Sequence, residues 1–233
     1  MTSLRLIASH LIKTPLHPQW LLGPRRLPAG LDGVAGVVLD VGAADRWIER
    51  RLPEHVTYIA LDYPPTGNDM YHAKPDVFAD GTRLPFADNS IDNVVCLEVI
   101  EHVRDAGTLL REIARVLRSG GHAWLSMPFM YPVHDAPHDY RRYTTHGLRR
   151  ELELAGLQVA WIRQTGHAIR TAGLLASISV AGGVYGRSGV RALLLPAAAL
   201  LVLGINVSAF VLSLVWPDWE GSGVLHEAEA RKP

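Results

Sequence analysis

Cysteine is nearly absent from this sequence, because Cys96 is the only one among 233 residues. A single cysteine forms no disulfide within the chain, and it cannot supply the cysteine clusters that hold structural zinc or iron–sulfur centres. We therefore expect an intracellular protein.

An excess of charge of either sign is also missing, since 23 Lys and Arg residues are balanced by 23 Asp and Glu residues. A chain without a net field has no general attraction for the phosphates of nucleic acid. No nucleic-acid partner is therefore predicted.

The N-terminal segment lacks the long apolar run of a signal peptide. Arg5, His10 and Lys13 interrupt its apolar pieces, and no small-residue cleavage site follows them. Residues 1–32 are predicted to form an N-terminal helical segment.

Short β-branched apolar runs alternate with helical patterns over residues 33–166, which we expect to form the core domain. The predicted strands cover residues 37–41, 56–61, 76–79, 91–97, 123–126 and 157–162. Apolar spacing predicts helices over residues 46–52, 109–117 and 148–155, the second of them ended by Ser119-Gly120-Gly121. This alternation predicts an α/β fold with a doubly wound, mostly parallel sheet.

Small residues follow the first predicted strand, in the order Val41-Gly42-Ala43-Ala44-Asp45. An adenosine cofactor in an open parallel sheet lies at this turn, beyond the carboxyl ends of the strands. Asp62 follows Asp40 by 22 residues, the spacing at which a carboxylate accepts both ribose hydroxyls. The turn thus indicates a cofactor site, although a merely tight turn has the same composition. The third glycine of the dinucleotide fingerprint is absent.

Three later segments carry a family resemblance. They are Asp80-Gly81-Thr82-Arg83-Leu84-Pro85-Phe86, Leu97-Glu98-Val99-Ile100-Glu101-His102-Val103 and Glu112-Ile113-Ala114-Arg115-Val116-Leu117. In this order and spacing, residues 37–163 resemble the small class I S-adenosylmethionine-dependent methyltransferases, a group that includes ubiquinone- and menaquinone-biosynthesis-like enzymes. The resemblance implies a Rossmann-like methyltransferase fold with seven strands, and S-adenosylmethionine as cofactor.

The resemblance also assigns roles around the cofactor. Asp40 and Gly42 would line its methionine portion, and Asp62 would bind its ribose. Asp80 would bind the adenine amino group, and Glu98 would form the floor beneath the sulfonium. The full predicted cofactor-binding set is Asp40, Gly42, Ala44, Asp62, Tyr63, Asp80, Gly81 and Glu98. Ala44 departs from the family, in which a second glycine is usual, and its methyl group could crowd the cofactor.

The loop from residue 128 to residue 144 holds the densest polar and aromatic cluster. Methyl transfer to a hydroxyl needs an in-line nucleophile and a base that removes its proton. A histidine supported by a carboxylate suits this task, and His134 with Asp135, or His138 with Asp139, could supply it. The predicted catalytic residues are His134, His138 and Asp139. A rigid lid made of prolines and aromatics would have the same composition.

The second half of this loop reads Pro137-His138-Asp139-Tyr140-Arg141-Arg142-Tyr143-Thr144. It resembles a loop of bacterial methyltransferases associated with surface-polysaccharide and glycan synthesis, which implies a sugar or lipid-linked acceptor. Arg141 and Arg142 could hold an anionic group of that acceptor. No metal is predicted, because no ligand spacing was found among His10, His17, His55, His72, His122, His146, His167 and His226.

Charged side chains are absent from residues 171–186 and again from residues 192–216. The second stretch would make a helix of ~38 Å, longer than a hydrocarbon layer of about 30 Å. We predict an apolar helical hairpin over residues 167–217, inserted between strands six and seven and in contact with a membrane through residues 171–216. Residues 218–233 are a polar tail that could add the seventh strand. A single membrane crossing is the alternative.

The sequence thus predicts a methyltransferase that acts on a small acceptor, lipid-linked or glycan, with O-methylation favoured. One alternative is C-methylation of a quinone-like ring. Another is a non-catalytic, membrane-associated scaffold on a methyltransferase fold. The expected location is the cytoplasmic side of the cell membrane, or the cytoplasm.

Overall fold

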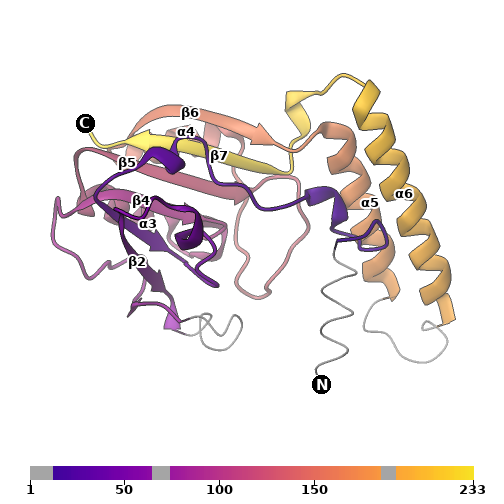
Figure 1. The fold of residues 1–233 in the computed structure, drawn as a ribbon, viewed down its shortest axis with the longest axis horizontal. Coiled ribbons are helices and arrows are strands. Elements are labelled where there is room, and N and C mark those ends of the chain that lie inside the picture. Colours follow the sequence, from indigo (N-terminus) through magenta and orange to yellow (C-terminus); the bar gives the residue numbers. More distant parts are fainter. Residues whose placement is uncertain (1–12, 65–73, 185–192) are drawn as a thin grey trace. The chain divides into compact units, whose positions relative to one another are not determined.

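The computed structural model describes residues 13–64, 74–184 and 193–233. Contacts divide the chain into two compact units (Figure 1). The sheet unit comprises residues 26–129, 133–163 and 225–233, and the helical unit comprises residues 1–25, 130–132 and 164–224. Each unit is described by itself.

A seven-stranded sheet of order β3-β2-β1-β4-β5-β7-β6 dominates the described chain. Its strands are β1 (Val37–Val41), β2 (Thr57–Asp62), β3 (Val77–Phe78), β4 (Ile91–Leu97), β5 (Leu117–Pro128), β6 (Gln158–Thr165) and β7 (Leu225–Arg231). The pairs β1–β2, β1–β4, β2–β3 and β4–β5 are parallel, whereas β7 runs antiparallel to β5. The predicted fold class is therefore confirmed, including the seventh strand.

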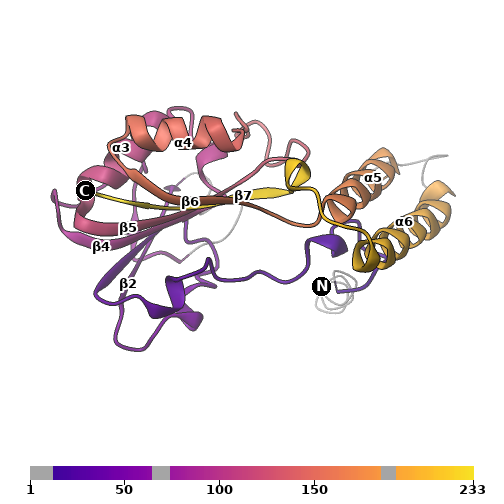
Figure 2. The same cartoon turned by 90° about the horizontal axis from the view of Figure 1, so that it is seen from above.

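Alternation along the strands divides the core between the two faces of the sheet. Leu39 and Val41 of β1 pack under the helices α3 (Ala106–Val116) and α4 (Thr145–Leu154), which cover one face in Figure 2. Val38 faces the opposite side and packs with Trp124 and Leu31. That side carries the 3-10 turns η2 (Leu31–Gly33) and η3 (Glu49–Arg51).

Two predicted helical boundaries were wrong. The helix expected over residues 46–52 is only the short turn η3, because Arg46 has a positive φ of 54° that no α-helix accommodates. The helix before β5 ends at Val116, and Ser119-Gly120-Gly121 lies within β5. Leu117 is buried and pairs with Ile91, so the chain passes from helix to strand without a loop.

The helical unit contains an antiparallel pair, α5 (Ala168–Val184) and α6 (Leu195–Val215), with the turns η1 (Trp20–Leu22) and η7 (Glu220–Ser222). Gly173 permits close packing, because a Cβ there would lie 2.5 Å from the Ala209 Cβ. Ser177 Oγ donates a hydrogen bond of 2.8 Å to Asn206 Oδ1. The pair has the form of a hairpin whose ends continue into β6 and β7. An N-terminal helical segment was expected over residues 1–32, and residues 13–33 contain the short 3-10 turns η1 and η2. Residues 1–12 and 185–192 lie outside the described residues.

Candidate active site

The turn after β1 is built on backbone hydrogen bonds to β2. The amides of Gly42 and Ala43 both donate to the Leu61 carbonyl, at 2.8 and 3.1 Å. Gly42 has φ +80°, and a Cβ at this position would lie 2.3 Å from Val99 Cγ2. Only glycine fits here without displacing the peptide that follows β4. The turn formed by Gly42, Ala43 and Ala44 is called the cradle below, and the Val99 side chain closes one side of it.

Asp62 ends β2 and holds the same turn. Its Oδ2 accepts the Ala44 amide at 2.9 Å, and its Oδ1 accepts the Tyr63 amide at 2.8 Å. Burial raises the pKa of the Asp62 carboxyl, and these two amides oppose that rise. Each carboxylate oxygen can accept a second hydrogen bond. Asp62 can therefore fix the turn and still accept from ligand hydroxyls.

Asp40 is buried inside β1, where the sequence did not indicate its partner. The Tyr58 hydroxyl donates to Asp40 Oδ2 at 2.6 Å. Burial raises the pKa of Asp40 to about 7, although the Tyr58 hydrogen bond lowers it. This carboxyl therefore changes its charge near neutral pH.

The remaining predicted cofactor residues follow neighbouring strands. Asp80 lies two residues beyond β3, is exposed, and accepts the amide and hydroxyl of Thr82, both at 2.8 Å. Gly81 is constrained by packing, since a Cβ there would lie 2.9 Å from Leu109 Cδ1. Glu98 follows β4 with φ +56° and accepts the Ser126 hydroxyl at 2.6 Å. Tyr63 is 44% exposed beside Asp62.

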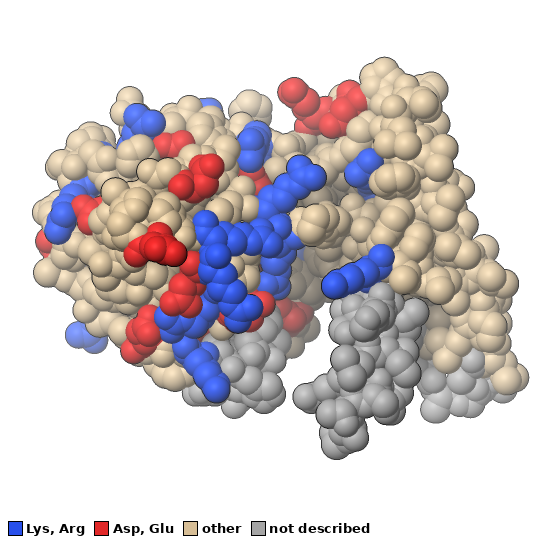
Figure 3. All heavy atoms as spheres, in the orientation of Figure 1, with Lys and Arg blue, Asp and Glu red and all other residues tan. Residues whose placement is uncertain are grey.

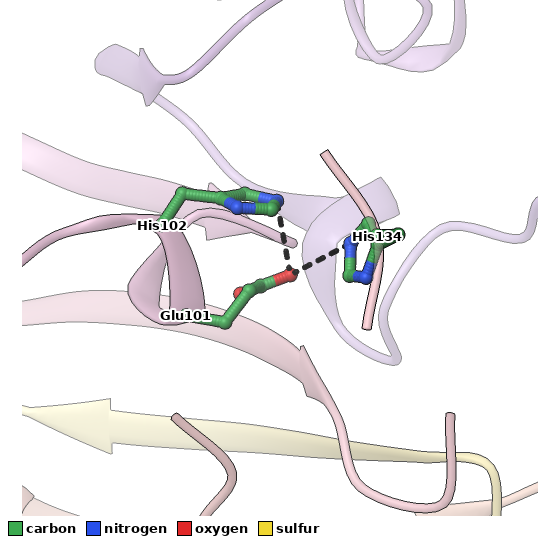
Figure 4. Close-up of side chains that lie close together, drawn as sticks. All are labelled: Glu101, His102 and His134. Carbon is green, nitrogen blue, oxygen red and sulfur yellow. Dashed lines mark ion pairs between the residues drawn. The ribbon is translucent and has the colours of Figure 1, made fainter. Parts of the chain in front are cut away.

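A second cluster forms where the turn η5 (Ile100–His102) faces the loop after β5 (Figure 4). Glu101 is fully buried, and its Oε1 lies 3.6 Å from His102 Nε2 and 4.0 Å from His134 Nε2. Burial, followed by the nearby Glu98 carboxylate, raises the pKa of Glu101 to about 9. Burial also lowers the pKa of His102. No role was predicted for Glu101 and His102 from the sequence, although both lie in a segment that carried the family resemblance.

The structure pairs His134 with Asp139. Asp139 Oδ2 lies 3.2 Å from His134 Nδ1 and also accepts the His134 amide at 3.0 Å. Arg142 donates to both oxygens of Asp139 and holds the pKa of that carboxyl at about 2. The sequence analysis had coupled His134 to Asp135 and His138 to Asp139. The ring of His138 instead lies 3.4 Å from the Tyr140 hydroxyl, measured from its Nδ1.

The first of these clusters has the chemistry that S-adenosylmethionine requires. The backbone of the turn after β1 lies against Val99, and three carboxylates belong to adjacent strands: Asp40 lies inside β1, Asp62 ends β2 and Asp80 lies two residues beyond β3. Such carboxylates accept hydrogen bonds from ribose hydroxyls and from amino groups. The donor and acceptor set is therefore suited to an adenosine ligand that carries a cationic amino acid portion.

Comparison with known proteins finds similarity to methyltransferases over part of the sheet unit. Residues 39–125, from β1 into β5, match the family described as a methyltransferase domain. An uncharacterized methyltransferase of Mycobacterium sp. (strain JLS) is 38% identical over 97 residues, which are 38% of this chain and 37% of that protein. A "Probable S-adenosylmethionine-dependent methyltransferase" of Mycobacterium tuberculosis (strain ATCC 25618 / H37Rv) is 39% identical over 74 residues, or 30% of this chain and 27% of that protein. The matched part spans well under half of the length of these relatives.

Solved structures share the fold over nearly the whole chain. A SAM-dependent methyltransferase from Archaeoglobus fulgidus has a TM-score of 0.54 at 14% identity, with 99% of this chain and 95% of that chain covered. An S-adenosylmethionine-dependent methyltransferase from Mesorhizobium loti has a TM-score of 0.51 at 17% identity, with 92% and 98% covered. At such identities the likeness concerns the fold alone.

Proposed function

This chain carries a class I S-adenosylmethionine-dependent methyltransferase domain, and on that premise we propose that it transfers a methyl group from S-adenosylmethionine to a hydroxyl of a small acceptor. The observation that carries the proposal is the cradle after β1, in which Gly42 fits against Val99 and Asp62 holds the Ala44 amide. When bound, the cofactor supplies an electrophilic methyl group on its sulfonium.

The chain's own residues would hold the cofactor at the carboxyl ends of the strands. Asp62 would accept hydrogen bonds from the ribose hydroxyls, and Asp80 from the adenine amino group. Ionised Asp40 would balance the positive charge of the methionine portion, and Glu98 would lie beneath the sulfonium. Tyr63, Gly81 and Ala44 would line the same cradle. The Ala44 amide is already engaged by Asp62, so its methyl group is held in a fixed position.

O-methylation is the chemistry that the second cluster favours. Arg142 fixes Asp139, and Asp139 Oδ2 lies 3.2 Å from His134 Nδ1, a position that favours a proton on Nδ1 and the lone pair on Nε2. An imidazole held in this tautomer can remove a proton from an acceptor hydroxyl. C-methylation of a quinone-like ring would use the same cofactor cradle. A non-catalytic scaffold would bind the cofactor there without transferring its methyl group.

Membrane contact of the helical unit would bring the domain to a lipid-linked acceptor. Among the described helices, α6 alone is both long and apolar enough to cross a membrane, with a mean hydropathy of 2.4, yet only 28% of that stretch is buried. A core helix of a soluble protein would be mostly buried. In Figure 3 the visible outer face of α6 is covered by residues other than Lys, Arg, Asp and Glu. We propose that this face lies in the lipid on the cytoplasmic side.

The hairpin form follows from the sheet, because β7 returns to it after α6. Both ends of the insertion then lie on one side of the membrane. Protease treatment of sealed inverted vesicles should therefore remove a C-terminal tag. A protected tag would mean a single crossing, and release of the protein by mild salt would exclude insertion.

The methyl-transfer proposal is tested with labelled S-adenosylmethionine. Incubation of the purified chain with lipid and glycan extracts should give a labelled product in which the methyl group is bound to an acceptor oxygen as a methyl ether. Label on carbon would favour the quinone-like alternative. Cofactor binding by calorimetry without any labelled product would favour the scaffold.

A further inference from the structure

Glu101 is a buried carboxyl without the partners that burial normally requires. Within the described part of the chain, neither of its oxygens has a hydrogen-bond partner, and its side chain is fully buried. Buried polar groups are almost always satisfied, and an unpaired carboxylate is costly. The groups that face it are the Nε2 atoms of His102 and His134, at 3.6 and 4.0 Å. These separations are too long for hydrogen bonds.

Both imidazoles turn Nε2 toward Glu101, and near each Nδ1 lies an oxygen atom that can accept a hydrogen bond. Nδ1 of His102 lies 2.9 Å from the His138 carbonyl, which can only accept, so this nitrogen holds the proton. Nδ1 of His134 lies 3.2 Å from Asp139 Oδ2, and Arg142 keeps that carboxylate in place. Metal-binding histidines are held in this way, with the outer nitrogen donating to a carbonyl or carboxylate.

We propose that Glu101, His102 and His134 bind a divalent first-row transition metal ion of the Zn²⁺ type. Their ligand atoms all lie within 4.8 Å of one another, and Figure 4 shows the three side chains converging. Two imidazole nitrogens and one carboxylate oxygen suit Zn²⁺ and its neighbours, whereas Mg²⁺ and Ca²⁺ prefer oxygen ligands. Ligand atoms around a tetrahedral ion are roughly 3.4 Å apart, so pairs of ligand atoms would approach one another by up to about 1.4 Å when the site closes.

Three protein ligands leave a coordination position open, as in catalytic metal sites. The chemical role of the ion rests on the proposed methyl transfer, whereas metal binding itself does not. The ion would stabilise negative charge that develops on the acceptor oxygen as the hydroxyl proton leaves to solvent. His134 would therefore serve as a ligand when the ion is bound, and as the base proposed above when it is not. No metal was predicted from the sequence, where eight other histidines showed no ligand spacing. His102 and His134 are 32 residues apart and meet only in the fold.

The inference is tested by metal titration of chelator-treated full-length protein, without cofactor or acceptor. Zn²⁺ is followed by calorimetry and Co²⁺ by its visible absorption. The wild type should bind one equivalent, and Glu101→Gln, His102→Ala and His134→Ala should each weaken binding by at least roughly 10- to 100-fold. The matched control is His146→Ala, which removes an exposed histidine of α4 and should bind as the wild type does.

Absence of stoichiometric binding to the wild type would overturn the inference, and so would ligand variants that bind as tightly as the control. Circular dichroism monitors the fold, and if Glu101→Gln unfolds, the two histidine variants decide. Calorimetry with S-adenosylhomocysteine measures the cofactor site by itself, and it thereby separates the proposed methyl transfer from the proposed metal site. Metal binding without methyl transfer counts against the proposed function alone, and methyl transfer without metal binding counts against the metal site alone.

Discussion

At the scale of a single residue, we expect Asp40 to make cofactor binding depend on pH. Burial raises its pKa to about 7, so most of its carboxyl is neutral at pH 6. S-adenosylmethionine is cationic at its sulfonium and amino group, and only the ionised carboxylate attracts it. We expect the Kd of the cofactor to rise as pH falls below 7, by up to ~10-fold per pH unit.

Calorimetry from pH 5.5 to 8.5 measures this dependence, and Asp40→Asn should remove it. Stability provides a second check. The carboxyl ionises near 3.8 when unfolded and near 7 when folded, so the folded state holds the extra proton between these values. The free energy of unfolding should therefore fall as pH rises from about 4 to 7 in the wild type, and less so in Asp40→Asn. A Kd that is flat across this range would exclude the role of Asp40.

Asp62 and Asp80 are carboxylates at strand ends, and each is expected to make hydrogen bonds to the cofactor. Asp62→Ala and Asp80→Ala should each weaken binding by about 1 to 3 kcal/mol while the protein remains folded. Titration calorimetry measures the affinity, and thermal unfolding measures the fold. Unchanged affinity in either variant would remove that residue from the site. Asp62→Ala should show the larger effect, because it also releases the Ala44 amide.

His134 and His138 lie in the same loop but have different surroundings. His134 faces Glu101 and is supported by Asp139, whereas the ring of His138 faces Tyr140. His134→Ala should lower turnover by roughly 10²-fold or more, with nearly constant cofactor affinity. His138→Ala should lower it less, because only its backbone carbonyl contacts His102. Equal turnover in the wild type and His134→Ala would leave the loop as a lid only.

At the scale of the element, the turn after β1 depends on Gly42. Gly42→Ala would place a methyl group 2.3 Å from Val99 Cγ2 in a backbone conformation that favours glycine. We expect a lower melting temperature and at least tenfold weaker cofactor binding. The control is the double variant Gly42→Ala with Val99→Ala, which removes the clash but keeps the backbone strain. Its recovery should be partial, and full wild-type affinity of the single variant would contradict the cradle.

The elements that could be predicted are those whose sequence is mostly apolar because they are buried. The strands β1, β2 and β4 are buried β-branched runs, and their predicted positions agree with the structure within a residue or two. The seventh strand contains His226, Glu227 and Glu229, which are unusual in a buried strand. Residues of the neighbouring strand β6 satisfy two of these: Glu229 accepts the Trp161 indole, and Glu227 binds Arg163. Such partners depend on sheet order, which sequence periodicity does not reveal.

The residues of the candidate site also differ in how far the sequence alone could indicate them. Spacing along the chain indicated Asp62, and the family resemblance implied the roles of Asp40, Asp80 and Glu98, which stay predictions. The pairs His134–Asp139 and His102–Glu101–His134 could not be predicted, because they depend on how the loop after β5 folds back onto η5. The Tyr140 amide donates to the Glu101 carbonyl at 2.9 Å and fixes that arrangement.

At the scale of the whole molecule, the exposed face of α6 is the surface that we propose to contact lipid. Leu200 and Leu214 are 68% and 64% exposed on this helix. The double variant Leu200→Glu with Leu214→Glu should lose flotation with liposomes, because charged side chains are costly in hydrocarbon. Its affinity for the cofactor should be unchanged. The matched control is Leu154→Glu, a similarly exposed leucine of α4 in the sheet unit, which should float as the wild type does. Flotation of the double variant would refute this face as the lipid contact.

The position of β7 between β5 and β6 sets the order in which the molecule can be completed. A ribosome delivers the chain from its N-terminus, so β1 to β4 emerge first and can already form the cradle. Between β6 and β7, however, the whole hairpin must emerge. Until residue 225 follows, β5 and β6 lack the strand that separates them. The last gap in the sheet therefore closes only after both apolar helices have been synthesised, and a ribosome near the membrane would give the hairpin access to lipid before the enzyme is finished.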